Sequence, residues 1–234
     1  MSTPAARLEL SRIARSVEAC QRCPRLIAWC REVARTRRRA FADQDYWGKP
    51  VSGFGDPSAR IWVLGLAPAA HGGNRTGRVF TGDRSGDFLY AALHRAGLAN
   101  QPHAVSRDDG LVLSGVYISA VGRCAPPQNK PTPQELANCQ EWLDRELAAL
   151  KRVRAVVALG KIAWDAALAM FARRGETVPR PRPAFGHGAS ARLGRYTLLG
   201  CYHVSQRNTF TGWLTEKMID RVLARAKEIA AARS

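Results

Sequence analysis

The sequence predicts an α/β fold in which helices cover both faces of a mostly parallel, four-stranded sheet. Four short apolar runs alternate with helical segments along the chain, and this order of strand, loop and helix is typical of parallel sheets. Long polar loops follow the first, second and fourth runs, at residues 67–83, 122–130 and 203–212. Because ligands bind beyond the carboxyl ends of parallel strands, these three loops are expected to meet at one site.

Strands are expected where apolar residues run without interruption, and helices where apolar residues recur every three or four positions. The expected strands cover residues 61–66, 115–121, 153–159 and 197–202. Helical spacing is found at residues 10–17, 26–33, 88–96, 132–150, 162–174 and 218–229. The segments 36–59 and 179–188 lack periodicity and are rich in Gly and Pro, so they are expected to be irregular.

Length and hydropathy limit the class of protein. The 234 residues suit one globular domain, and 46% hydrophobic residues are enough to fill its core. No apolar run approaches the roughly 18 residues that a bilayer span needs. The first residues alternate charged and apolar types, which is not the pattern of a secretory signal. A soluble, cytoplasmic protein without a membrane partner is therefore expected.

The chain is strongly basic, with 36 Lys and Arg against 19 Asp and Glu and a formal charge of +17. Only six of the basic residues are Lys. Arginine binds phosphate through a planar, bidentate fork, so this excess favours nucleic acid as the partner. A GC-rich genome would also favour Arg over Lys, but it does not explain the shortage of acidic residues.

The loop at 65–83 carries the first candidate site residues. It lacks the Gly-Lys-Ser/Thr ending of a phosphate-binding P-loop and the Gly-x-Gly-x-x-Gly fingerprint of a dinucleotide site. Its glycines allow close approach of the backbone to a ligand, and Phe80 is suited to stacking on a planar base. Asp83 precedes a helix, so it is either an N-cap or a catalytic carboxylate.

The loop at 203–212 begins with His203 at the end of the fourth strand. A histidine placed there either has a structural role or donates a hydrogen bond to an oxygen that becomes negative in a transition state. The polar residues that follow could enter a groove of DNA, with Phe210 as a wedge.

Cysteines form the third constellation. Cys20 and Cys23 have metal-ligand spacing, and Cys124 and Cys139 are the best further partners. Four thiolates bind either zinc or an iron–sulfur cluster, so the spacing leaves the metal open. Cys139 alternatively packs in a helix core, while Cys30 and Cys201 are typical of buried, inert thiols.

Three segments together resemble the motifs of family-5 uracil-DNA glycosylases, which carry an iron–sulfur cluster. They are GLAPAAHGGNRTGRVFTGD at 65–83, RCAPPQNKPTPQEL at 123–136 and HVSQRNTFTG at 203–212. The resemblance extends from about Cys20 to the C-terminal helix. It implies a three-layer α/β/α sandwich with a central four-stranded parallel sheet. It also implies one domain over 1–234, made of a helical segment with the CxxC (1–59), a catalytic core (60–212) and a C-terminal helix (213–234).

The resemblance also implies an activity and its residues. Similar enzymes excise uracil, and often hypoxanthine or xanthine, from DNA. Asp83, His203 and Asn129 are then the expected catalytic residues. Phe80, Ala67 and His71 are assigned to the base, and Arg75, Gln206, Arg207 and Asn208 to the DNA. Cys20, Cys23, Cys124 and Cys139 are expected to hold a structural [4Fe–4S] cluster. A monomer that acts on double-stranded DNA in the nucleoid is expected.

Two positions differ from other cluster-bearing families and match family 5. Leu66 stands where those relatives have a Glu, and Ala120 stands where they have a base-reading Asn. Without the Asn, broader base specificity is expected. Without the Glu, Asp83 is the best remaining carboxylate for activating water.

Two other functions compete with this interpretation. One is a non-catalytic, cluster-bearing protein that binds nucleic acid without releasing a base. The other is a zinc hydrolase that uses His71, His187 and His203, although no two of these lie within one helical turn.

Overall fold

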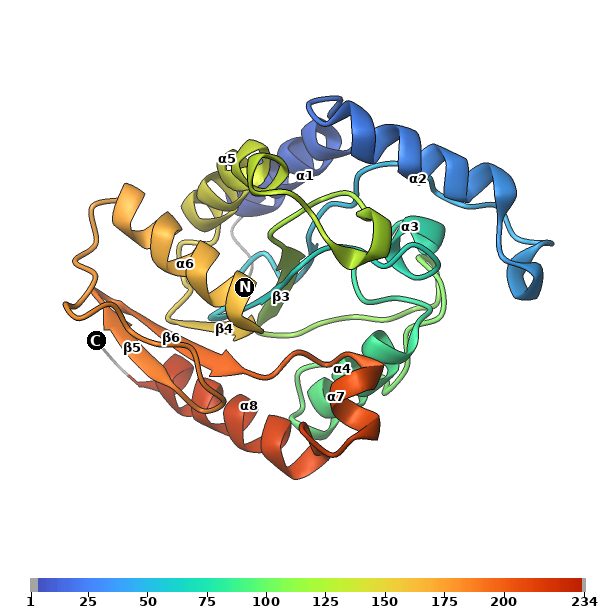
Figure 1. Ribbon diagram of the computed structural model, residues 1–234. Helices are drawn as coiled ribbons and strands as arrows, with labels where there is room; N and C mark the ends of the chain where they lie inside the picture. Colours follow the sequence, from blue (N-terminus) through green and yellow to red (C-terminus); the bar gives the residue numbers. More distant parts are fainter. Residues whose placement is uncertain (1–3, 233–234) are drawn as a thin grey trace.

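The computed structural model describes residues 4–232, which fold around one six-stranded sheet (Figure 1). The strands are β1 (Phe54–Gly55), β2 (Ile61–Gly65), β3 (Val116–Ala120), β4 (Ala155–Leu159), β5 (Ser190–Leu193) and β6 (Tyr196–Cys201). The longer helices are α1 (Pro4–Glu18), α2 (Pro24–Thr36), α4 (Arg84–Arg95), α5 (Pro133–Ala149), α6 (Lys161–Arg173) and α8 (Glu216–Ala231). Short helices are α3 (Gly73–Thr76), α7 (Gln206–Phe210), η1 (Arg39–Phe41) and η2 (Pro127–Asn129).

The strand order is β1-β3-β2-β4-β6-β5, and the four inner strands are parallel. These four are the strands that the apolar runs predict. The prediction of a four-stranded sheet is incomplete, because β1 and β5 extend it antiparallel at the two edges. β1 has only two residues, and β5 alternates exposed and buried side chains, so neither forms a continuous apolar run. The predicted N-terminal segment 1–59 thus contributes a strand.

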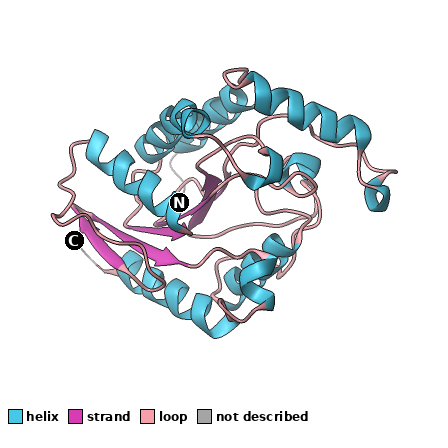
Figure 2. Cartoon of the chain, in the orientation of Figure 1, coloured by secondary structure: helices cyan, strands magenta, loops and turns pink. Residues whose placement is uncertain are grey.

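Helices cover both faces of the sheet (Figure 2). The four parallel strands are buried on both faces, and alternate residues enter two separate cores. Trp62 and Leu64 of β2 face the core formed with α1, α5 and α6. Ile61 and Val63 face the core formed with α4 and α8. This two-sided burial is the arrangement expected of an α/β/α sandwich.

Helix α5 shows how local sequence sets the boundary of an element. Thr132 accepts a hydrogen bond from the Glu135 amide, and the Glu135 carboxylate accepts one from the Thr132 amide. This capping box, with Pro133 in the first turn, fixes the start of the helix as predicted.

Within residues 4–232, no helix combines the length and the apolar character needed to span a membrane.

A buried ion pair links the loop after β3 to α5. The Arg123 guanidinium donates to both carboxylate oxygens of Glu146, at 3.0 and 2.7 Å, and both side chains are at most 1% exposed. The Tyr117 hydroxyl also donates to Glu146, at 3.5 Å. A bidentate pair of this kind offsets the cost of removing both charges from water.

Glu146→Gln is expected to lower the free energy of unfolding by about 3–5 kcal/mol, because it leaves the Arg123 charge buried without a counter-ion. Denaturant unfolding of the two proteins measures this difference. Asp144→Asn on the same helix is the control. It removes a partly exposed pair with Arg173, for which a loss of about 0–1 kcal/mol is expected. Equal losses in the two variants would contradict the assigned role of the buried pair.

Candidate active site

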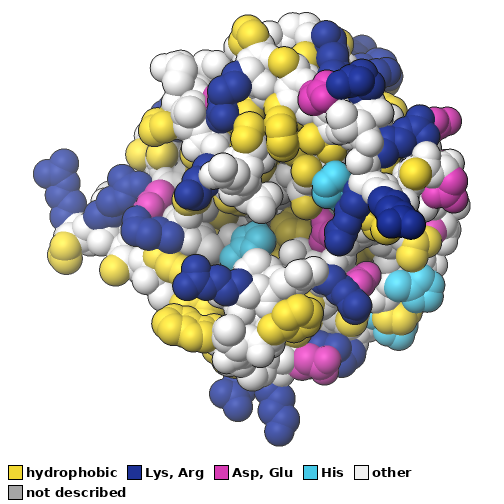
Figure 3. Space-filling view, turned by 45° about the vertical axis from the view of Figure 1, so that its right-hand side comes forward, with side chains coloured by type: hydrophobic (Ala, Val, Ile, Leu, Met, Phe, Trp, Pro, Cys, Tyr) yellow, Lys and Arg dark blue, Asp and Glu magenta, His cyan; other side chains and the backbone are white. Residues whose placement is uncertain are grey.

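A cavity of about 250 Å³ lies at the carboxyl end of the parallel strands, where the three polar loops meet. It is lined by Leu66, Ala67, Ala69, Phe80, Asp83, Ser85, Asn129, His203 and Ser205. The convergence of the three loops is therefore confirmed. The cavity lies below the roughly 300–1,000 Å³ of sites for drug-sized ligands, so it suits a single ring system. Its outer side joins a wider groove on the molecular face seen in Figure 3.

Phe80 lies against the end of β2. A Cβ atom on Gly65 would meet the Phe80 ring at 2.5 Å, so the glycine makes room for the aromatic side chain. Phe80 has a φ of 51°, a left-handed conformation that is rare for an aromatic residue. The surrounding loop holds this costly backbone conformation, and the ring forms one wall of the cavity.

Asp83 caps a helix and also lines the cavity. Its Oδ1 atom accepts a hydrogen bond of 3.0 Å from the Gly86 amide at the start of α4. Its Oδ2 atom lies so close to Gly72 that a Cβ there would collide with it. Burial raises the pKa of Asp83, although hydrogen bonds from the Gly86 and Ser85 amides act in the opposite direction. The N-cap alternative is thus confirmed, and Asp83 also lines the cavity, while its catalytic role stays a prediction.

His203 follows β6 and lies deep in the cavity, with its ring centroid 6.4 Å from that of Phe80. Burial lowers the pKa of His203, so the imidazole is neutral near pH 7. Its carbonyl accepts a hydrogen bond of 2.8 Å from the Asn208 side chain, which ties the residue to α7. A neutral imidazole held in this way is able to donate one hydrogen bond from its protonated ring nitrogen.

Asn129 lines both the cavity and the wider groove. It is exposed and ends η2, where Gln128 and Asn129 both have positive φ values, of 54° and 57°. Two consecutive non-glycine residues in this region are costly, so the loop holds Asn129 in a defined place.

The two other residues assigned to the base lie in different places. Ala67 lines the cavity, and its assignment to the base stays a prediction. His71 lines the wider groove, and its Nδ1 atom shares a hydrogen bond of 3.0 Å with the Tyr46 hydroxyl. Burial and the charges of Arg38 and Arg75 lower the pKa of His71.

The four residues assigned to DNA contact differ in their exposure and in their partners. Gln206 lines the groove, and Arg207 is exposed on α7. The Asn208 amide is used within the protein, on the His203 carbonyl. Arg75 is only 8% exposed, and its guanidinium donates to Gln44 and to the carbonyls of His71 and Gly82. Their contacts with DNA stay predictions.

The four predicted cysteine ligands come from three separate parts of the chain. Cys20 and Cys23 lie between α1 and α2, Cys124 follows β3, and Cys139 lies in α5. The Asn138 side chain donates to the Cys23 sulfur at 3.4 Å, which places Cys23 beside the turn of α5 that carries Cys139. Cys23 and Cys124 share a small buried cluster with Cys30. The fold thus gathers all four, with Cys30 as a fifth thiol beside them.

The surroundings of these cysteines are basic. The charges of Cys20 and Cys139 help to raise the pKa of Arg22, after its larger hydrogen bond with Glu141. Buried Arg123 lies near Cys139, and its Nε atom has no hydrogen-bond partner among the described residues. An unpartnered donor and nearby guanidinium groups fit an anionic group held by thiolates.

No group of three or more His, Cys, Asp or Glu side chains within residues 4–232 is close enough to hold one metal ion. The zinc hydrolase alternative therefore has no ion site in this part of the chain. His187 instead accepts a hydrogen bond from the Tyr202 amide, and His71 is bonded to Tyr46. An iron–sulfur cluster differs from one ion because each thiolate binds a different iron, which spreads the sulfur atoms apart.

The sequence analysis does not identify several residues that line the cavity and the groove. Ala69, Ser85 and Ser205 line the cavity beside residues that the motifs do identify. Arg38, Phe41, Gln44, Arg84 and Asp87 line the wider groove. The first three lie in the aperiodic segment 36–59, where a cluster of arginines is the one available signal.

Comparisons with known proteins show the family of this chain. The family model described as the uracil DNA glycosylase superfamily matches residues 52–227. A type-5 uracil-DNA glycosylase of Mycobacterium tuberculosis is 54% identical over 216 residues, covering 92% of this chain and 79% of the relative. One of Thermus thermophilus is 54% identical over 217 residues, covering 92% and 95%. A type-4 uracil-DNA glycosylase of Pyrobaculum aerophilum is 28% identical over 170 residues, covering 72% and 69%.

The structure thus defines an α/β protein with a small cavity at the carboxyl ends of its parallel strands. The chain belongs to the uracil-DNA glycosylase superfamily and, within it, to the type-5 family.

Proposed function

We propose that this protein is a monofunctional glycosylase that hydrolyses the N-glycosidic bond of uracil in DNA and leaves an abasic site. The observation that carries the proposal is the meeting of Phe80, Asp83, Asn129 and His203 around one small cavity. The printed names of the relatives, type-5 uracil-DNA glycosylase, support the same activity.

The mechanism begins with a nucleotide that leaves the duplex and enters the cavity, because the reacting bond is not accessible inside the base stack. Phe80 stacks on the flipped base. The glycosidic bond then breaks toward an oxocarbenium-like sugar, as in other glycoside hydrolyses. Negative charge collects on the departing base.

His203 and Asp83 act on opposite sides of this bond. The ring N–H of neutral His203 donates a hydrogen bond to the base oxygen as that oxygen becomes negative, and the proton stays on the imidazole. Ionised Asp83, with Asn129 beside it, orients or activates the water that adds to the anomeric carbon. Backbone amides near Ala67 assist at the base, and no cofactor takes part in bond cleavage.

We propose a wider substrate range that includes hypoxanthine and xanthine. Ala120 stands where a base-reading amide is found in other cluster-bearing families, so rejection of other bases by paired hydrogen bonds is weakened. Asn129 is the single side-chain amide among the described residues that line the cavity.

Release of free uracil from a duplex with one uracil tests the activity, with hypoxanthine and xanthine duplexes in parallel. Formation of an abasic site is the expected product. Binding to the uracil duplex without release of base would favour the non-catalytic alternative. A single-stranded uracil substrate shows whether the duplex is required.

We further propose that Cys20, Cys23, Cys124 and Cys139 hold a [4Fe–4S] cluster. Burial raises the pKa of the Cys139 thiol, and the nearby Cys23 and Cys20 raise it further. Crowded thiolates of this kind are stable when iron offsets their charge. When bound, the cluster supplies a structural link between the α1–α2 junction, β3 and α5.

Cys124→Ser is expected to purify with little iron and sulfide and with loss of visible absorbance, because one ligand of the cluster is gone. Cys30→Ser is the matched control, since Cys30 lies in the same buried cluster but is not assigned as a ligand. Iron, sulfide and zinc analysis of both variants measures the difference. Zinc in the wild-type protein, or full iron content in Cys124→Ser, would contradict the assignment.

A further inference from the structure

A segment between α2 and the region that the superfamily model matches is bound to the first motif loop. It comprises residues 37–47, and we name it the arm. The Trp47 amide donates to the Arg75 carbonyl at 2.8 Å, and the Tyr46 hydroxyl shares the hydrogen bond with His71. The superfamily model begins at residue 52 and so leaves the arm out, whereas the alignments with the type-5 relatives, of 216 and 217 residues, include it. In Figure 1 this part of the chain extends beyond the end of α2.

Arg75 joins the arm to the candidate catalytic carboxylate. Its guanidinium lies 3.9 Å from the centre of the Phe41 ring and donates to the Gln44 side chain. Its other terminal nitrogen donates to the Gly82 carbonyl at 2.6 Å, one residue before Asp83. The arm is therefore held at a fixed place relative to Asp83.

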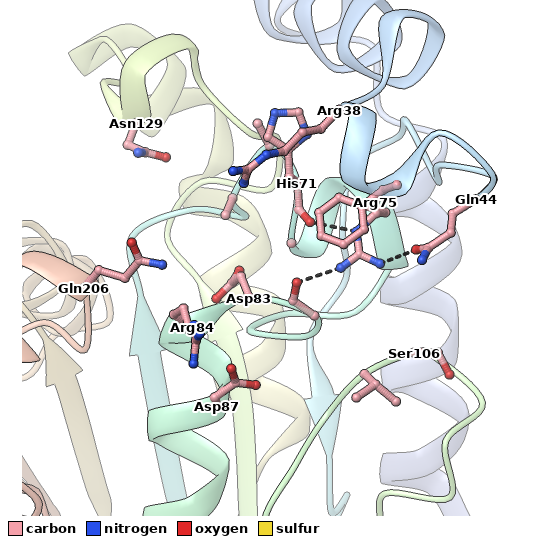
Figure 4. Close-up of a pocket in the computed structure, with 16 residues that line it drawn as sticks. Arg38, Gln44, His71, Arg75, Asp83, Arg84, Asp87, Ser106, Asn129 and Gln206 are labelled. Carbon is pink, nitrogen blue, oxygen red and sulfur yellow. Dashed lines mark hydrogen bonds between the residues drawn. The ribbon is translucent and has the colours of Figure 1, made fainter.

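The arm forms one wall of the wider groove, which has a volume of about 890 Å³. Arg38, Phe41 and Gln44 line this wall, and Arg84 of α4 lines the groove near Asp83. In Figure 4, Arg38 and Arg84 lie on different sides of Asp83, with Gln206 and Asn129 farther to one side. The groove and the base cavity share Asp83 and Asn129, so a chain in the groove leads directly to the cavity.

Arg38 and Arg84 differ from most arginines of this protein. Many others are paired with a carboxylate, including Arg37 of the arm with Asp45. Within residues 4–232, the guanidinium groups of Arg38 and Arg84 have no hydrogen-bond or ion-pair partner. Two unpaired guanidinium groups that line one groove favour a ligand with separated anionic groups.

We propose that the arm is a strand-binding wall, and that Arg38 and Arg84 hold the phosphates on the two sides of the nucleotide that enters the cavity. This inference rests on the proposed function. The carboxylates of Asp83 and Asp87 also line the groove and repel phosphate, which confines the phosphates to the two guanidinium groups.

Arg38→Ala tests the contact. The probe is a fluorescent duplex with one uncleavable abasic-site analogue, and the Kd is measured by anisotropy from 50 to 200 mM salt. One lost phosphate contact lowers the slope of log Kd against log salt by about 0.9, so the rise in Kd over this range shrinks about 3.5-fold. Arg152→Ala is the matched control, an exposed arginine just before β4, at the opposite end of the sheet from the cavity. The slope of log Kd against log salt is expected to fall less in Arg152→Ala than in Arg38→Ala.

The double variant Phe41→Ala, Gln44→Ala tests the position of the arm without changing the charge of the protein. It leaves the net charge unchanged but removes two of the contacts that fasten the arm to Arg75. Binding to the same duplex is expected to weaken. Equal slopes for Arg38→Ala and Arg152→Ala, or wild-type binding by the double variant, would overturn the inference. Release of uracil by the wild-type protein is assayed separately, so failure of the proposed function is distinguished from failure of the arm.

Discussion

Asp83→Asn is expected to slow base release by about 10²-fold or more, while DNA binding stays near the wild-type level. The amide still offers an oxygen to the Gly86 amide, so the cap of α4 is kept, but it cannot take a proton from water. Single-turnover cleavage of a uracil duplex measures the rate. Asp144→Asn on α5, outside the described lining of the cavity and the groove, is the control. An unchanged rate in Asp83→Asn would remove this carboxylate from the mechanism.

The pH dependence of base release and the Tm also test the role of Asp83. Because burial raises the pKa of Asp83 and the ionised form is needed, wild-type base release falls as pH drops through that raised pKa. The stability effect has the opposite sign, since a raised pKa means that the folded state binds this proton more tightly than the unfolded state. Ionisation at neutral pH therefore costs stability, and Asp83→Asn is expected to have a Tm no lower than wild type.

His203→Ala is expected to reduce base release by about 10²–10³-fold, because it removes the donor to the oxygen that becomes negative. The carbonyl of residue 203 still accepts from Asn208, so the start of α7 is preserved. Single-turnover rates measure the loss, and His94→Ala, at an exposed position of α4, is the matched control.

A second measurement separates a catalytic from a structural role for His203. The Tm of His203→Ala reports any general damage to the fold, while its affinity for the uncleavable duplex reports binding. A slow rate with near-normal Tm and affinity is the expected combination. A rate as fast as that of His94→Ala would leave His203 with a structural role alone.

The central strands could be predicted from sequence because their residues are buried on both faces. The run Ile61–Gly65 lies entirely inside the protein, so an unbroken apolar stretch marks it. The edge strands give no such signal. β5 reads as Ser190-Ala191-Arg192-Leu193, four residues of alternating polarity after a Gly- and Pro-rich segment, and it is too short to stand out.

The candidate site could be predicted in part. His203 follows the end of β6, and Phe80 and Asp83 lie in the long loop between β2 and α4. Loops that follow parallel strands meet at one edge of the sheet, so chain order predicts that the three residues lie at that edge. Arg75 shows the limit of this reasoning. Its charge and loop position suggested a surface contact, yet Phe41, Gln44 and Gly82 enclose it. Two of these partners belong to a segment without periodicity, whose position depends on tertiary contacts.

The cysteines illustrate the same limit. The spacing of Cys20 and Cys23 marks a pair of ligands, because both lie on one turn between two helices. Nothing local connects that turn with Cys139. Their proximity arises because α1 and α5 share one core and Asn138 reaches the Cys23 sulfur.

The end of β2 separates the lining of the cavity from the two hydrophobic cores. β2 ends in Gly65, which has no side chain, and the space above it is filled by one aromatic ring from a loop. The interior layers that hold the molecule together lie beneath this point and do not contribute side chains to the opening. Substitution of single loop residues at the opening therefore leaves the buried residues of both cores in place.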